Sequence, residues 1–137
     1  RLDPGKELLI NGKPFFPNPH KDVIHQVAMA SSGHRLCDFT NFHGKIRVFG
    51  SAILHLLAPV IYPEIQGAMN SSVYVWDFCA AHAVLCHFDY RLLYEDGRPV
   101  TYTDRLLKER KNTGEFIFAG TINGVVDLQH KIKVVPR

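Results

Sequence analysis

Two short segments carry residue types that could bind an anion and a divalent cation. Gly50, Ser51 and Ala52 open a helical pattern, where a glycine lets the backbone approach a ligand and free N–H groups attract anions. Asp77 follows Trp76 at the start of a second helical pattern, where a carboxylate could bind Mg²⁺. Each segment alone has an ordinary structural explanation, because glycine shapes turns and Ser and Asp are common N-caps.

A third group of residues suggests thiol or zinc chemistry less strongly. Cys79, His82 and Cys86 fall on one face of the predicted helix after Asp77, in a sequence that is apolar almost all round. Core packing explains them better than zinc, since no second ligand cluster accompanies them. A thiol–histidine pair in this helix is expected to be buried, which argues against a nucleophilic cysteine. No C-x-x-C, G-x-S-x-G, Walker A or H-E-x-x-H pattern occurs.

Composition indicates one globular domain spanning residues 1–137. Apolar residues make up 46% of the 137 residues and charged residues 21%. The net charge of +3 is small and dispersed, and the basic run 108–111 contains Glu109, so we expect no nucleic-acid partner. No apolar run reaches the roughly 20 residues that span a bilayer, so we expect no membrane partner. The odd count of three cysteines favours a reduced, cytoplasmic location. Because the chain begins at Arg1 without an initiator Met, we interpret it as a processed product or an excised fragment.

Strand and helix patterns alternate along the chain and would position these residues. Asn11-Gly12 between two apolar runs predicts a hairpin over 6–16 with a type I′ turn. Ser51 is the expected N-cap of a helix that ends before Pro63, and Asp77 is the expected N-cap of a buried helix. Further strands are expected at 23–30, 45–49 and 115–119, an apolar run at 92–94 before a turn, a short helix or loop at 104–111, and a closing helix at 121–132; 65–75 is ambiguous. This order predicts an α/β layered sandwich with a mostly parallel or mixed sheet flanked by helices.

Several motifs, in this order, resemble the inositol monophosphatase family. Gly50-Ser51-Ala52-Ile-Leu resembles its GSA-type turn, and Trp76-Asp77-Phe-Cys-Ala-Ala-His-Ala resembles its W-D-x-A-A-G-H-A helix start. The N-G-K-P hairpin, Asp96-Gly97-Arg-Pro and the strand 116–119 are similar to further family segments, so the resemblance covers nearly the whole chain. It implies the carboxyl-terminal half of the sugar-phosphatase fold, with the 6–16 hairpin belonging to the amino-terminal sheet.

The resemblance also implies a function and a set of site residues. Asp77 would be a Mg²⁺ ligand, and Gly50, Ser51, Ala52 and Asn70 would bind a small phosphorylated substrate, with the loop 31–35 as a further substrate-facing segment. The reaction would be hydrolysis of phosphate monoesters such as inositol phosphates, with metal ions activating a water molecule. The family's G-E-E and D-P-I/L-D-G-T ligand motifs are missing here. We therefore assign no catalytic residue, expect the chain alone to be inactive, and expect Mg²⁺ only with an amino-terminal half.

Two departures from the family pattern leave other functions open. Asn70 stands where many members carry Glu, and Phe88-Asp89-Tyr90 replaces the usual A-G-G. One alternative is a 3′(2′),5′-bisphosphate nucleotidase of the same superfamily, and another is a non-catalytic interaction domain that keeps the fold. Apolar surface left where an amino-terminal layer would pack also predicts a homo-oligomer.

Overall fold

The computed structural model describes residues 1–71, 73–110 and 115–136. Ser72 in the ambiguous segment and Lys111 in the expected helix over 104–111 lie outside the described residues. Among the helices of the described ranges, none combines the length and the apolar composition that crossing a bilayer requires.

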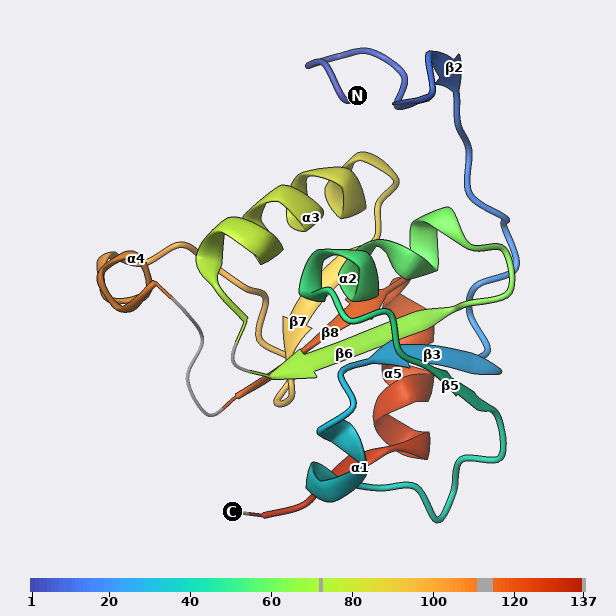
Figure 1. Ribbon diagram of the computed structural model, residues 1–137, viewed down its shortest axis with the longest axis vertical. Helices are drawn as coiled ribbons and strands as arrows, with labels where there is room; N and C mark the ends of the chain where they lie inside the picture. Colours follow the sequence, from blue (N-terminus) through green and yellow to red (C-terminus); the bar gives the residue numbers. More distant parts are fainter. Residues whose placement is uncertain (72, 111–114, 137) are drawn as a thin grey trace.

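A mixed five-stranded sheet forms the centre of the molecule (Figure 1), with the strand order β5-β3-β6-β8-β7. Its members are β5 (Lys45–Arg47), β3 (Gln26–Met29), β6 (Gly67–Ser71), β8 (Phe116–Gly120) and β7 (Arg91–Tyr94). Strand β3 is parallel to both β5 and β6, whereas β8 is antiparallel to both β6 and β7. The sheet is therefore mixed, as the sequence predicts.

The sequence of the segment 65–75 is ambiguous because it combines a buried strand with polar residues at the end of that strand. Every residue of β8 is buried, and so is all of β6 except the half-buried Ser71, because helices cover both faces of the sheet. Asn70 and Ser71, which look like loop residues, lie inside β6. Their polar side chains mark the carboxyl end of the strand.

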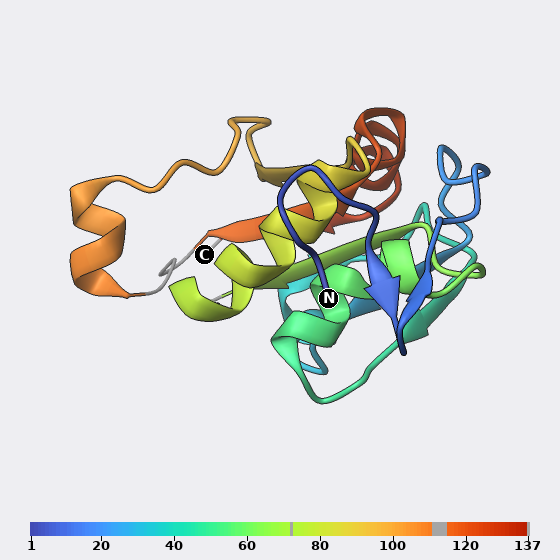
Figure 2. The same cartoon turned by 90° about the horizontal axis from the view of Figure 1, so that it is seen from above.

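Helices cover both faces of this sheet and complete the predicted layered sandwich. Helices α2 (Ala52–Ile61) and α3 (Val75–His87) lie on one face, and α5 (Ile122–Lys131) and α1 (Gly33–Leu36) lie on the other (Figure 1). One core cluster, which includes Leu56, Phe78 and Leu85, packs under α2 and α3. A second cluster, which includes Met29 and Leu128, packs under α5. The short helix α4 (Asp104–Glu109) projects to one side (Figure 2).

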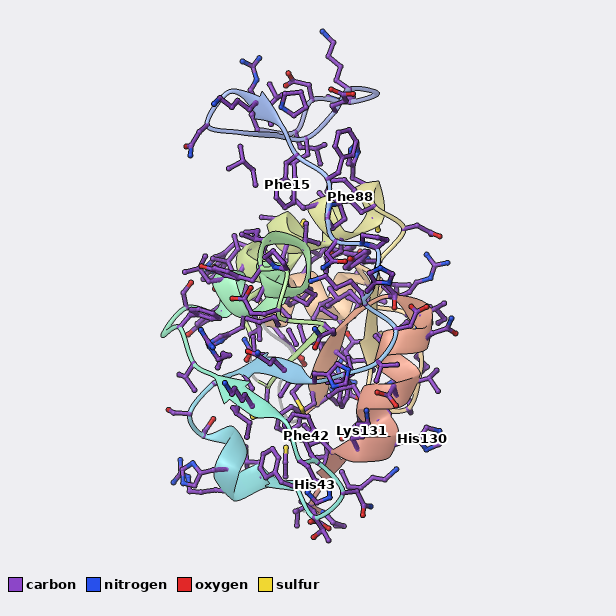
Figure 3. The ribbon with its side chains drawn as sticks, turned by 90° about the vertical axis from the view of Figure 1, so that its right-hand side faces the viewer. Phe15, Phe42, His43, Phe88, His130 and Lys131 are labelled. Carbon is purple, nitrogen blue, oxygen red and sulfur yellow. The ribbon has the colours of Figure 1, made fainter. Side chains whose placement is uncertain are left out.

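Two small two-stranded sheets lie outside the central one. The predicted hairpin is confirmed: β1 (Leu9–Ile10) pairs with β2 (Lys13–Pro14), and Asn11 and Gly12 have φ angles of 53° and 77°. It lies over α2 and α3 (Figure 2), and the ring of Phe15 meets that of Phe88 edge-on at 6.4 Å (Figure 3). The second small sheet pairs β4 (Cys37–Asp38) with β9 (Lys133–Val134), which the sequence does not predict.

The prediction that Asp77 caps α3 is wrong. Tyr74 is the N-cap, with extended backbone angles and no capping side-chain hydrogen bond, and Asp77 is the third helical residue. The carbonyl of Tyr74 accepts the backbone N–H groups of Asp77 and Phe78 at 3.0 and 3.2 Å. The carboxylate of Asp77 therefore lies in the first turn, where a negative charge interacts favourably with the helix dipole.

The prediction that α3 is a buried helix is also wrong. Phe78, Ala81 and Leu85 are its buried residues, while Cys79 and Cys86 are exposed and the residue Trp76 is 58% accessible. The sequence is apolar on both faces, but the chain supplies a covering layer for one face. The cysteines of this helix are consequently accessible thiols and not core residues.

Candidate functional site

A cavity of about 230 Å³ lies at the carboxyl ends of the parallel strands. It is lined by Ala30, Ser31, Val48, Gly50, Ser51, Ala52, His55, Asn70, Ser71 and Val73. The structure thus brings together the four residues that the sequence predicts to contact substrate, along with Ser31 from the predicted second loop. Such a position, at the carboxyl ends of strands, is where α/β sheets commonly bind ligands.

The turn before α2 has the geometry that its sequence predicts. Gly50 has a φ of 71°, and a Cβ atom there would meet nothing within 4 Å, so backbone conformation and not space requires glycine. Ser51 is the N-cap, and its hydroxyl accepts the backbone N–H of Leu54 at 3.5 Å. The remaining N–H groups of the first turn are free to bind an acceptor.

His55 is a cavity residue that the sequence analysis missed. It lies on the inner side of α2 with 2% of its surface accessible, and its Nε2 accepts the backbone N–H of Phe49 at 2.9 Å. Burial lowers the pKa of His55, and the hydrogen bond with Asn70 raises it in part. Its position in the sequence could have indicated a role at the site, because His55 is the polar residue in the otherwise apolar run 52–61.

Asn70 is buried and makes its contacts within the protein. Its Oδ1 accepts the backbone N–H of Ala30 at 3.1 Å, and its Nδ2 lies 3.3 Å from Nδ1 of His55. The Asn70 side chain therefore links β3, β6 and α2 at the cavity wall. The role of Asn70 as a substrate contact remains a prediction.

Asp77, the predicted metal ligand, is half-buried and does not line the cavity. Helices α2 and α3 nevertheless begin on the same side of the molecule, the side toward which β6 points (Figure 1). Within the described ranges, no three His, Cys, Asp or Glu side chains gather as a metal site would require. The role of Asp77 as a Mg²⁺ ligand stays a prediction.

Sequence comparison alone places the chain in no family, whereas its fold is well represented. No family model and no curated protein matches the sequence. Its structure matches the extragenic suppressor protein SuhB of Bartonella henselae with a TM-score of 0.66 at 17% identity over 95% of this chain. The chain has the fold of half an inositol monophosphatase.

Two further solved structures support this fold. They are inositol monophosphatase from Anabaena (Nostoc) sp., with a TM-score of 0.61 at 18% identity over 96% of this chain, and staphylococcal IMPase-II, with 0.69 at 15% over 92%. The chain spans about half of each matched structure: 50% of SuhB, 55% of the Anabaena protein and 48% of the staphylococcal one. The sequence resemblance to the inositol monophosphatase family is thus confirmed at the level of the fold.

One departure from the inositol monophosphatase pattern has a visible structural consequence. Asp89, where the family has glycine, follows α3 with a φ of 61°, a conformation that glycine adopts more easily. The preceding Phe88 contacts Phe15 of the hairpin strand region (Figure 3), which a glycine or alanine could not do. Phe88 thus adds a contact between the amino-terminal segment and the end of α3.

The zinc alternative finds no support in the site geometry. Nδ1 of His82 lies 2.8 Å from the hydroxyl of Tyr102, so this ring nitrogen is already engaged. In the part of the chain that the structure describes, no three His, Cys, Asp or Glu side chains gather around it. Cys79 and Cys86 are exposed on the same helix.

Proposed function

We propose that this chain forms the substrate wall of a Mg²⁺-dependent phosphatase that hydrolyses small phosphate monoesters, and that Asp77 supplies one metal ligand. The observation that carries the proposal is the cavity that gathers Gly50, Ser51, Ala52 and Asn70 at the carboxyl ends of the strands. The free N–H groups at the start of α2 would donate hydrogen bonds to substrate oxygens.

The ligands of similar structures support this substrate class. Staphylococcal IMPase-II has been solved with inositol monophosphate and with 2′-AMP, and an IMPase/NADP phosphatase has been solved with Mg²⁺ and phosphate. Each of these ligand sets contains a phosphate group or a small phosphate monoester. A small phosphorylated compound is therefore the ligand to test first.

The chain alone is proposed to lack catalytic activity. Hydrolysis in this class needs carboxylates that place metal ions, which activate a water molecule and neutralise charge on the phosphoryl oxygens. Asp77 is a single carboxylate, and Mg²⁺ loses its waters reluctantly, so one ligand is too few to hold the ion firmly. We propose that the other ligands come from an amino-terminal half that carries the G-E-E and D-P-I/L-D-G-T motifs.

The proposal is tested by a ligand titration and a phosphatase assay on the chain as it stands. Inositol monophosphate with Mg²⁺ should shift the amide NMR signals of Gly50, Ser51 and Ala52, whereas unphosphorylated inositol should shift them much less. Shifts confined to residues away from this turn would contradict the proposed substrate wall. Phosphate release should stay at the background rate, and robust Mg²⁺-dependent release would refute the proposed inactivity.

The engagement of Asn70 favours one alternative, a non-catalytic interaction domain. A family Glu at this position contacts a substrate hydroxyl, whereas the Asn70 amide bonds to the backbone of Ala30 and faces His55. Under this alternative, neither inositol monophosphate nor 2′-AMP would shift the signals of the Gly50 turn. A bisphosphate nucleotidase would instead respond more strongly to 3′-phosphoadenosine phosphates than to inositol monophosphate.

We also propose self-association and a cytoplasmic location. Trp76, Tyr74 and Leu54 leave apolar surface accessible on the α2 and α3 side of the molecule, which favours contact with a second copy. Sedimentation should show a dimer or larger species that Trp76→Lys shifts toward monomer, and a monomeric wild-type chain would contradict this. The accessible thiols of Cys79 and Cys86 suit a reducing compartment.

A further inference from the structure

Three hydrogen-bond donors surround the side chains of His55 and Asn70, which offer too few acceptors for all three. The backbone N–H of Phe49 points at its Nε2 from 2.9 Å, and the Asn70 side-chain amide lies 3.3 Å from its Nδ1. The backbone N–H of Ala30 points at the same amide from 3.1 Å. Because buried donors without acceptors are costly, this arrangement restricts the protonation state of the ring.

The ring must be neutral with its hydrogen on Nδ1. A neutral imidazole has one N–H group and one lone pair, and the N–H of Phe49 requires the lone pair to be on Nε2. The Nδ1–H group then requires an acceptor, which the Asn70 amide supplies once its oxygen and nitrogen exchange places, since Nδ2 stands 3.3 Å from Nδ1. This exchange takes the oxygen away from the N–H of Ala30, which then requires another acceptor.

A proton on Nε2 would remove the acceptor of Phe49. The backbone N–H would then face an N–H group at hydrogen-bond distance, and the turn would lose the contact that fixes it to α2. Phe49 immediately precedes Gly50, which adopts its φ of 71° without strain, so the contact with His55 and not backbone strain ties this end of the turn to α2. The protonation of one ring nitrogen thus decides whether this contact can form.

We infer that His55 is a proton-sensitive positioning residue: its neutral Nε2 holds the N–H of Phe49 and fixes the Gly50–Ser51 turn, and proton uptake releases that turn. The hydrogen bond is independent of any substrate. The statement that the turn is a substrate wall rests on the proposed function.

Among the residues that the structure describes, no other ionisable side chain lines the cavity. Strands β3, β6 and β8, which pack against α2, also carry none in their described residues. Helix α3, which packs on α2 as well, carries Asp77, Cys79, His82, Cys86 and His87. The ring of Tyr62 stacks on that of Phe49 with centroids 5.1 Å apart. The causes that shift the pKa of His55 are burial, which lowers it, and the Asn70 amide, which raises it.

The direction of the pH effect follows from this shift. Because the pKa of His55 is lowered in the folded protein, its neutral form contributes stability fully above the ordinary value of 6.5. This contribution to stability is lost as the pH falls below 6.5 and passes through the pKa of His55 in the folded protein. Release of the turn is therefore expected in mildly acidic solution.

The experiment measures hydrogen exchange at the Phe49 amide and the ring nitrogen shifts of His55 against pH. Protection at Phe49 should fall about tenfold as His55 takes up a proton, the factor that corresponds to one ordinary hydrogen bond. His55→Gln places an amide oxygen near the position of Nε2, so protection should persist and no longer depend on pH in this range. His55→Phe should lose the protection, and the control His82→Gln should leave the wild-type titration unchanged.

Several outcomes would overturn the inference. Protection at Phe49 that does not follow the His55 titration, or that survives in His55→Phe, would do so. If His55→Phe fails to fold, the wild-type ring spectrum decides alone, since a hydrogen on Nε2 at neutral pH contradicts the proposed bond. The proposed function fails separately if inositol monophosphate leaves the Gly50 turn unchanged while Phe49 still follows His55.

Discussion

Near the edge of the sheet, an added methyl group should lower the stability of the fold most at Gly44. A Cβ atom there would lie 1.9 Å from the carbonyl oxygen of His25 and 2.7 Å from Cζ of Phe42. The first of these is backbone, which cannot rotate away. The carbonyl of His25 also accepts the N–H of Lys45 at 3.0 Å, so relieving the clash would break a hydrogen bond between β5 and the residue that precedes β3.

The cost of Gly44→Ala follows from these two effects. Forcing extra volume into a packed site costs about 1–3 kcal/mol. Loss of the His25–Lys45 hydrogen bond adds about 0.5–1.5 kcal/mol. We therefore expect Gly44→Ala to lower the free energy of unfolding by about 1.5–4.5 kcal/mol, measured by urea denaturation followed by circular dichroism.

Gly50→Ala is the matched control, because the cause of its cost is different. Gly50 has open space around its Cα atom but a φ of 71°, so alanine there should cost about 1–2 kcal/mol from backbone strain alone. Asn tolerates this conformation, so Gly50→Asn should recover part of that loss, whereas Gly44→Asn should be no better than Gly44→Ala. A Gly44→Ala variant within about 0.5 kcal/mol of wild type would refute the reasoning from close contact.

Three further changes test other parts of the structure by the same measurement. Burial lowers the pKa of Lys21 from 10.5 to about 8. Between pH 8 and 10.5 the free energy of unfolding of the wild-type chain should therefore rise by up to about 3 kcal/mol relative to that of Lys21→Met. A difference between the two chains that does not change with pH would contradict the lowered pKa. Asp89→Gly should stabilise the fold by about 1 kcal/mol, because φ is 61° and the ion pair with Arg91 is exposed; a loss of stability would argue against backbone strain. Thr121→Ala should cost about 1 kcal/mol, since its hydroxyl accepts the N–H of Gly124 at 2.9 Å as N-cap of α5; no loss would contradict the cap.

Local signals in the sequence were enough to predict most elements. The Asn11-Gly12 hairpin, the helix that Ser51 caps and the closing helix α5 are specified by residues within one or two turns of themselves. The pairing of β4 with β9 could not be predicted in this way. Each of these strands is two residues long, and their pairing depends on where α5 places the residues that follow it.

Burial and site chemistry were harder to predict because they depend on which surfaces meet. The run after Asp77 is apolar on both faces, so its sequence indicates burial, but the fold covers one face and leaves Trp76 accessible. The Gly50 turn and Asn70 could be assigned to one site through a family resemblance. His55 could not, since its role depends on the positions of the Phe49 and Asn70 groups that surround it.

Paramagnetic broadening by Mn²⁺ tests most directly whether Asp77 and the Gly50 turn belong to one metal-dependent site. With inositol monophosphate present, Mn²⁺ in place of Mg²⁺ should broaden the amide signals of residues 76–78 and 50–52 first, even if it binds weakly. Asp77→Asn should abolish this effect. Broadening that is unchanged in Asp77→Asn, or that centres on His25 and His43 at the opposite end of the strands, would contradict the proposed site.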